Sequence, residues 1–336
     1  MNRQPASAGR AGGPNWRTLW RTLWRPTLRL TLRVVLGLSL LTPALSGCAW
    51  LDVKQRGWIY RPTPGQLSDW QAITLQDEAF WLSRPADADA VADVPGASPP
   101  AQRLRAIWVP GPDAAAPAVL YLHGTFRNLF QNRAKIAAIQ GAGFAVLALD
   151  YRGWGESSAA LPSEASIVED AELAWAELQR RVPQAAARII FGHSMGSGVA
   201  VELALRHRAG PAYGALVLES AMTSMPDIAR AQGFWGGVAA LVTTQQFASI
   251  NKIGLIDAPK WFLTGTADNT VPSRQTERLY AAAHGPRQLE RFVGGSHSGL
   301  AQEFPARYRA IWQQVAATVA AIAAATGAAP PAAPPP

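Results

Sequence analysis

Cysteine is almost absent from this sequence. Cys48 is the only one among 336 residues, so no disulfide can form within the chain and packing must supply its stability. His, Cys and Asp residues are also not clustered at the spacings that metal sites require. The sequence therefore implies no metal and no organic cofactor.

Acidic residues are missing from the first part of the chain. Residues 1–47 carry seven arginines and no Asp, Glu or Lys, whereas the net charge of the whole chain is +8. The remainder is left with a net charge of about +1 once this basic segment is set aside. The excess positive charge therefore belongs to the leader, and we expect no nucleic-acid-binding surface.

A hydrophobic run long enough to span a membrane is also missing near the N-terminus. The apolar stretch at residues 34–45 is short, whereas a spanning helix needs about 20 residues. A basic segment followed by a short apolar core is the order found in signal peptides. We therefore predict that residues 1–47 are a signal peptide.

The sequence LSGC at residues 45–48 resembles the lipobox of bacterial lipoproteins. The resemblance implies lipid attachment to the Cys48 thiol and cleavage of the chain just before it. The alternative is an ordinary buried cysteine in a helix. The residue directly after Cys48 is Ala49 and not Asp. Under the bacterial sorting rule that the resemblance implies, this favours localisation to the outer membrane, facing the periplasm. We therefore expect a lipid-anchored protein of the bacterial cell envelope.

Short apolar runs alternate with amphipathic segments over residues 101–325, which predicts an α/β fold with a mostly parallel sheet and helices on both faces. Residues 48–100 are expected to be an irregular lead-in followed by a first strand and a loop. Residues 326–336 are expected to be a disordered Ala/Pro tail. The expected strands are 73–83, 103–109, 118–124, 144–150, 187–194, 214–220, 260–265 and 289–294; the expected helices are 128–143, 163–182 (with Ser163 as its cap), 196–208, 273–285 and 306–326.

The strand predicted at residues 187–194 ends in the sequence G-H-S-M-G. This G-x-S-x-G pattern, with a buried strand before it and a helix after it, is a nucleophile elbow that projects Ser194 above the sheet. The flanking positions must be small because the turn is tight, and Gly198 is expected to let the helix pack on the sheet. The alternative is a purely structural turn.

Candidate partners for Ser194 follow the last two predicted strands. Asp268 comes three residues after one strand end, and His297 lies after the final strand. A serine hydroxyl needs an imidazole to take its proton and a carboxylate to orient that imidazole. Ser194, Asp268 and His297 are therefore the predicted catalytic residues, and Glu219 is the rival candidate for the acid.

Two backbone N–H groups are needed to bind an oxyanion. The candidates are Met195, directly after the nucleophile, and Thr125, with Phe126 as the alternative to Thr125. The other histidines are expected to play no direct part. His123 should brace a loop, His193 should point away from the site, and His207 and His284 should lie at the surface.

Six stretches in this order resemble the α/β-hydrolase superfamily, in particular lidless or small-lid relatives of serine aminopeptidases and abhydrolase-domain proteins. They are LYLHG, LALDYRGWGES, FGHSMGSG, VLESAMTSM, TGTADNTVP and GGSHSG. The chain departs from the family pattern at Thr125-Phe126-Arg127, where a glycine-rich sequence is expected. Arg127 could meet an anionic substrate group or simply face solvent. The Asp150-Tyr151-Arg152 cluster should act as loop scaffolding.

Residues 222–255 are too few for a large lid, so a small or absent lid and a nearly open site are expected. The favoured function is a membrane-anchored serine hydrolase of esters or thioesters that acts on a small-molecule or acylated substrate. One alternative is a peptidase of the serine aminopeptidase-like branch, although residues 222–255 offer no acidic cluster for a substrate amine. The other is a non-catalytic envelope lipoprotein.

Overall fold

The computed structural model describes residues 50–65, 76–84, 102–210 and 212–327. The chain divides into two compact units, residues 1–53 and 54–336, and of the first unit only the helical residues 50–53 are described. The predicted leader, Cys48 and nearly all of the predicted tail lie outside the described residues. No helix in the described part of the chain is long and apolar enough to cross a membrane.

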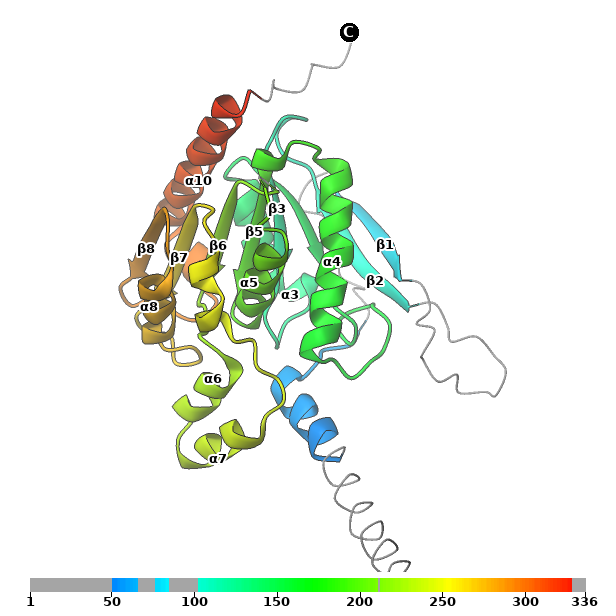
Figure 1. Ribbon diagram of the computed structural model, residues 1–336. Coiled ribbons are helices and arrows are strands. Elements are labelled where there is room, and N and C mark those ends of the chain that lie inside the picture. Colours follow the sequence, from blue (N-terminus) through cyan, green and yellow to red (C-terminus); the bar gives the residue numbers. More distant parts are fainter. Residues whose placement is uncertain (1–49, 66–75, 85–101, 211, 328–336) are drawn as a thin grey trace, which may run out of the picture. The chain divides into compact units, whose positions relative to one another are not determined.

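The second unit is built on one eight-stranded sheet in the order β1-β2-β4-β3-β5-β6-β7-β8 (Figure 1). β1 and β2 run antiparallel to their neighbours, and the other pairs are parallel. The predicted mostly parallel sheet is therefore confirmed. The strands are β1 Glu78–Arg84, β2 Gln102–Val109, β3 Ala118–Leu122, β4 Ala145–Leu149, β5 Arg188–His193, β6 Ala215–Glu219, β7 Lys260–Gly265 and β8 Arg287–Phe292.

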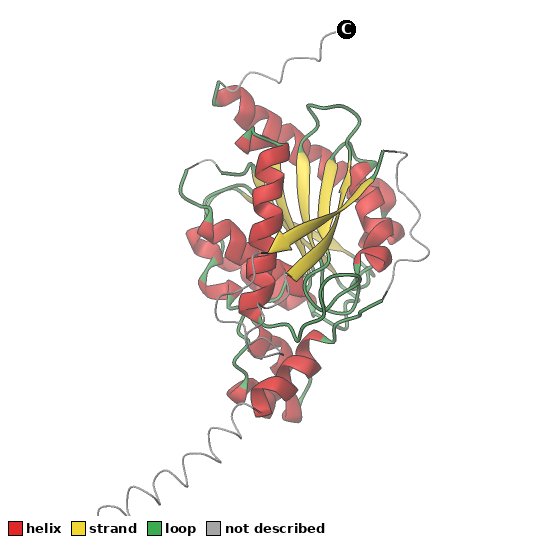
Figure 2. Ribbon diagram, turned by 90° about the vertical axis from the view of Figure 1, so that its right-hand side faces the viewer, coloured by secondary structure: helices red, strands yellow, loops and turns green. Residues whose placement is uncertain are grey.

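Helices cover both faces of this sheet, as Figure 2 shows. Residues of α4, α5 and α8 share one core with the sheet, and residues of α3, α9 and α10 share the other. The described helices are α3 Leu129–Gln140, α4 Glu164–Arg181, α5 Met195–Arg206, α6 Met225–Ala231, α7 Phe234–Val242, α8 Ser273–Ala282, α9 Leu300–Glu303 and α10 Pro305–Ala325; 3₁₀ turns occupy Ala185–Ala187, Ser249–Asn251 and Ile253–Leu255.

The two cores explain why the inner strands are continuously apolar. In β3 the side chains of Val119 and Tyr121 enter the core under α3 and α10. Leu120 and Leu122 alternate with them and enter the core under α4 and α5. A parallel strand between two helical layers has no solvent face, so the short apolar runs in the sequence correctly marked these strands.

Helix starts agree with local sequence signals. Ser163 caps α4 as predicted, since its side chain accepts from the Ser166 N–H at 3.1 Å and the Ser166 hydroxyl accepts from the Ser163 N–H at 2.8 Å. Asn128 and Gln131 form the same reciprocal arrangement at the start of α3. Each cap satisfies backbone donors that a helix leaves free at its first turn.

The irregular structure predicted for the lead-in is wrong at residues 50–60, which are helical, whereas residues 61–65 contain no helix. Tertiary contacts support this helix within the second unit. Gln55 Nε2 donates to Thr244 Oγ1 at 2.8 Å, and the Tyr60 hydroxyl donates to Gln245 Oε1 at 2.6 Å. Both partners lie almost 190 positions away in sequence, so no local pattern could have indicated these contacts.

The role expected of Gly198 is also wrong. A Cβ atom at this position would lie 2.9 Å from the Phe247 side chain rather than against the sheet. Phe247 follows α7 and is buried in the core that contains α4 and α5. The missing side chain therefore makes room for the segment that returns from α7.

Candidate active site

Ser194 lies at the sharp turn between β5 and α5. Its backbone has φ 56° and ψ −123°, a strained conformation for a residue with a side chain. A Cβ atom on Gly192 would collide with the Gly196 carbonyl, and one on Gly196 would collide with the Leu122 carbonyl. The flanking positions must therefore be glycine, as the elbow motif predicts.

The side chains of Ser194, His297 and Asp268 form one continuous chain of hydrogen bonds. His297 Nε2 lies 3.0 Å from Ser194 Oγ, and His297 Nδ1 lies 2.7 Å from Asp268 Oδ2. Since a carboxylate can only accept, Nδ1 carries the proton and Nε2 is free to accept the serine proton. The structure thus brings together the three residues named from the sequence.

Strand order explains why these residues meet. β7 pairs with β8 along its whole length, so the loops that follow them, carrying Asp268 and His297, lie side by side. The other oxygen of Asp268 accepts from the N–H groups of Thr270 and Val271 at 2.9 and 2.8 Å. The buried carboxylate is therefore held by its own loop while it faces His297.

Glu219, the rival acid, does not contact His297. One of its oxygens pairs with the Lys135 ammonium, and the other accepts from the Tyr308 hydroxyl at 2.9 Å. All three side chains are buried beneath the elbow. The Glu219 carbonyl also accepts from the Ser194 N–H at 3.0 Å, so this residue supports the strained turn from below.

His193 does not point away from the site, contrary to the sequence prediction. Its Nε2 lies 2.9 Å from the carbonyl oxygen of His297, which also accepts from the Ser220 hydroxyl at 3.0 Å. Because a carbonyl only accepts, Nε2 of His193 carries a proton. Burial, together with the charge of Lys135, holds the pKa of His193 well below its ordinary value, so the ring is neutral.

The remaining histidines lie away from Ser194 Oγ. His123 is fully buried, and its Nδ1 lies 2.6 Å from the Gly124 carbonyl, in keeping with a brace for this loop. Burial lowers the pKa of His123 to about 4. His207 is half-buried, and its Nε2 lies 2.8 Å from Oε2 of Glu172. His284 is exposed.

Two backbone amides lie next to Ser194 without a partner among the described residues. Met195 N–H opens α5, and Thr125 N–H follows Gly124, where a Cβ atom would lie 3.0 Å from that of Ser194. The Thr125 carbonyl accepts from the buried indole of Trp154 at 2.6 Å. Trp154 therefore fixes the loop that carries the second candidate oxyanion donor.

Comparisons with known proteins agree with this arrangement. A family model described as "Serine aminopeptidase, S33" matches residues 113–247. An uncharacterized protein of Mycobacterium tuberculosis is 31% identical over 73% of this chain and 81% of its own length. The α/β-hydrolase domain-containing protein WAV2 of Arabidopsis thaliana is 29% identical over 75% of this chain and 84% of its own length. This chain belongs to the α/β-hydrolase superfamily.

Further similarities agree with the hydrolase fold. The lysophosphatidylserine lipase ABHD12 of Danio rerio is 30% identical, over 52% of this chain and 49% of that protein. The solved structure of an esterase from Pyrococcus furiosus covers 76% of this chain and 97% of its own, with a TM-score of 0.56 at 17% identity. The solved structure of a putative hydrolase from Agrobacterium vitis covers 71% of this chain and 98% of its own, with a TM-score of 0.55 at 18% identity. At these identities the two structures support the fold alone.

A hollow of about 510 Å³ lies beside His297. Its lining holds no carboxylate, and it is bordered by Phe126, Arg127, Thr270, Ser296, His297, Ser298, Gly299 and Gln302. Arg127 is exposed at this rim. The described residues contain no group of three His, Cys, Asp or Glu side chains that could hold a metal ion.

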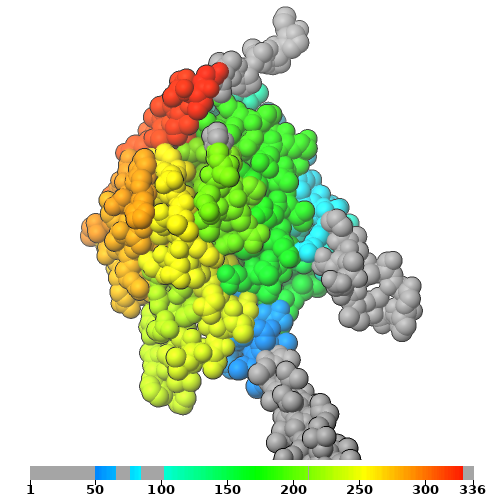
Figure 3. Space-filling view, viewed as in Figure 1, coloured from blue at the N-terminus to red at the C-terminus, as the bar shows by residue number. Residues whose placement is uncertain are grey.

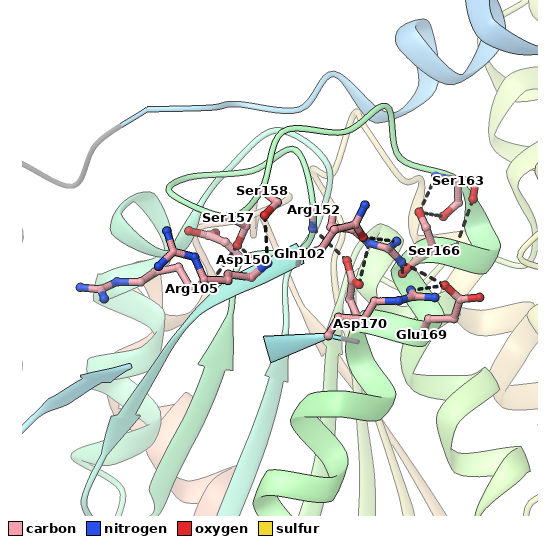
Figure 4. A network of polar contacts seen from close by, with 12 residues as sticks. Gln102, Arg105, Asp150, Arg152, Ser157, Ser158, Ser163, Ser166, Glu169 and Asp170 are labelled. Carbon is pink, nitrogen blue, oxygen red and sulfur yellow. Dashed lines mark hydrogen bonds and ion pairs between the residues drawn. The ribbon is translucent and has the colours of Figure 1, made fainter. Parts of the chain in front are cut away.

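The loop that follows β4 is held by the polar network in Figure 4. Arg152 contacts Asp170 at 2.8 Å, Glu169 at 3.0 Å and the Gln102 side chain at 2.8 Å. The Asp150 carbonyl accepts from the Ser157 hydroxyl at 2.6 Å. As expected, this cluster is a scaffold, and it orients the loop that carries Trp154.

Sequence reasoning missed three supporting residues, Lys135, Trp154 and Ser220, and gave His193 the wrong orientation. Lys135 left a signal, because it is the one basic residue on the apolar side of its helix, between buried Asn132 and Ile136. Trp154 and Ser220 left none, because nothing in their neighbouring sequence indicates their partners, the Thr125 and His297 carbonyls.

Proposed function

We propose that this protein is a serine hydrolase that cleaves carboxylic esters or thioesters. The observation that carries the proposal is the hydrogen-bonded chain of Ser194, His297 and Asp268 at the carboxyl edge of the sheet. The curated relative named a lysophosphatidylserine lipase also supports ester chemistry.

The geometry suggests how the reaction would proceed. His297 Nε2 takes the proton of Ser194 Oγ as that oxygen attacks the substrate carbonyl, while Asp268 stabilises the imidazolium. The N–H groups of Met195 and Thr125 bind the oxyanion. His297 then protonates the leaving oxygen or sulfur, which leaves an acyl group on Ser194. A water activated by His297 releases the acid and restores the enzyme.

A peptidase is the second candidate, because the matching family model is described as a serine aminopeptidase. Recognition of a substrate amine calls for a carboxylate near the nucleophile. The hollow beside His297 is lined by no acidic residue and carries Arg127 at its rim. This charge distribution favours the ester or thioester reaction.

Labelling with a fluorophosphonate probe tests the serine assignment. The wild type should label and should hydrolyse chromogenic esters of graded acyl length faster than aminoacyl chromogens. Ser194→Ala should lose both activities while it keeps its melting temperature. Labelling retained in folded Ser194→Ala, or absent from the wild type, would contradict the proposal and favour a non-catalytic protein.

We also propose that a lipid on Cys48 anchors the protein to the outer membrane of the bacterial cell envelope, facing the periplasm. The support is the order of basic segment, short apolar core and LSGC sequence. Metabolic labelling with palmitate in a Gram-negative host should mark the wild type and not Cys48→Ala. A mature N-terminus other than residue 48 would contradict this anchoring.

A further inference from the structure

One side of α7 is strongly apolar and faces solvent. Phe234, Trp235 and Leu241 expose 78%, 79% and 80% of their surface, and Val238 and Val242 are also exposed. These positions recur at the spacing of a single helix face. Few soluble surfaces gather so many large apolar side chains without a binding role.

The opposite side of α7 is occupied by α6. A Cβ atom on Gly236 would collide with the Ala229 carbonyl of α6, and Ala240, one turn later, is buried. In Figure 3 the yellow-green residues of this helix pair form a lobe at the lower edge of the molecule. The exposed apolar face is therefore not the side by which α7 packs on its own fold.

Charge is distributed unevenly around this lobe. Residues 231–251 contain no Asp, Glu, Lys or Arg. The adjoining segment 54–61 carries Lys54, Arg56 and Arg61, and its Trp58 is 70% exposed. Of the carboxylates at the lobe, Asp227 of α6 is paired with Arg230 and Arg278, and Glu164 accepts from the Gln246 N–H at 2.7 Å. This segment runs beside the chain that follows α7, because Gln55 bonds to Thr244 and Tyr60 to Gln245.

We propose that α7 and segment 54–61 dock this protein on an anionic lipid bilayer. Exposed Trp, Phe, Leu and Val side chains partition into the interfacial region of a bilayer, and neighbouring cations attract its anionic headgroups. An uncharged apolar patch beside a cationic segment matches a lipid surface better than it matches a second copy of itself.

The docking depends neither on a lipid at Cys48 nor on the hydrolase reaction, since it rests on the exposed face of α7 and the adjoining charges.

A single-cysteine probe tests the docking directly. In full-length Cys48→Ala protein, Leu241→Cys is labelled with the fluorophore NBD and mixed with vesicles of phosphatidylethanolamine and phosphatidylglycerol. We expect the emission to rise several-fold and shift to the blue. The same label at Ala325→Cys, at the exposed end of α10, which lies far from α7 in Figure 1, should not respond.

A second measurement compares vesicle partitioning of unlabelled full-length variants, all with Cys48→Ala and the same leader. Trp235→Ser with Leu241→Ser should lower the partition coefficient about tenfold, whereas Ala325→Ser should leave it unchanged. The far-UV circular dichroism spectrum and the melting temperature check that each variant is folded.

Two outcomes would overturn the proposal. The protein could sediment with the vesicles while the NBD emission at residue 241 stays unchanged. That result would show that another segment makes the contact. A signal that changes with protein concentration in lipid-free buffer, and not with lipid, would assign the face to a second copy of the chain.

Discussion

Nε2 of His193 lies 2.9 Å from the backbone carbonyl oxygen of His297, and the two rings are tilted by 45° with their centroids 5.0 Å apart. The residue next to the candidate nucleophile thus holds the loop that presents the candidate base. Two neighbours in one elbow therefore serve different purposes: Ser194 points toward the substrate side, and His193 ties that elbow to the His297 loop.

His193→Phe keeps a ring at this position but removes the donor. We expect kcat to fall about 10- to 100-fold with little change in KM, because a displaced base affects the chemical step more than binding. The pH dependence of kcat/KM should also shift as His297 relaxes. Ser220→Ala, which removes the other donor to the same carbonyl, is the matched comparison. Unchanged kcat in both variants would show that the loop is held without these bonds.

The acid that orients His297 can be identified by two isosteric substitutions. Asp268→Asn should lower kcat on the order of 10⁴-fold, because the amide cannot hold the imidazole in its working tautomer. Glu219→Gln should lose much less activity, since its carboxylate faces Lys135 and Tyr308 rather than His297. Ester hydrolysis by both purified variants gives the comparison, and the reverse order of effects would move the acid to Glu219.

Lys135 and Glu219 form an ion pair buried beneath the elbow. Burial holds the pKa of Lys135 below its ordinary value, and Glu219 opposes that shift. Lys135→Met leaves the Glu219 carboxylate buried without a cation, which should cost about 3–5 kcal/mol of unfolding free energy. Denaturant titration measures this loss. The double variant Lys135→Met with Glu219→Leu should regain part of it; a further loss would show that the pair itself is stabilising.

His123 makes stability depend on pH. Its pKa is about 4 in the folded chain because burial disfavours the imidazolium, against 6.5 for an exposed histidine. The unfolded chain therefore binds more protons between these values, so this contribution is complete above pH 6.5 and is lost as the pH falls toward 4.

Between pH 6.5 and pH 4 the unfolding free energy should fall by about 3 kcal/mol because of His123. The difference in unfolding free energy between wild type and His123→Asn, measured from pH 7 to pH 4, isolates it. Asp150, whose pKa is raised to about 8 by burial, contributes with the opposite sign and lies 3.7 Å from His123 Nε2, so the same comparison is repeated in an Asp150→Asn background. A difference that does not vary with pH would contradict the prediction.

The sequence by itself determined the sheet, its main helices and the place of each candidate catalytic residue. Strands buried on both faces must be continuously apolar, and the elbow after β5 requires glycine on both sides of Ser194. Asp268 and His297 could be named because polar residues directly after parallel strands gather at one edge of the sheet. All these signals are local, since each depends on a few neighbouring positions.

Tertiary structure alone decided which distant groups support that edge. Lys135 and Glu219 are 84 positions apart, and His193 and His297 are 104 apart, so their contacts depend on strand order and not on spacing. The helix at residues 50–60 forms against residues 244 and 245. The exposed face of α7 was also decided by tertiary packing. Its apolar residues would suit a buried core as well. Only the packing of α6 against one side leaves Phe234, Trp235 and Leu241 exposed on the other.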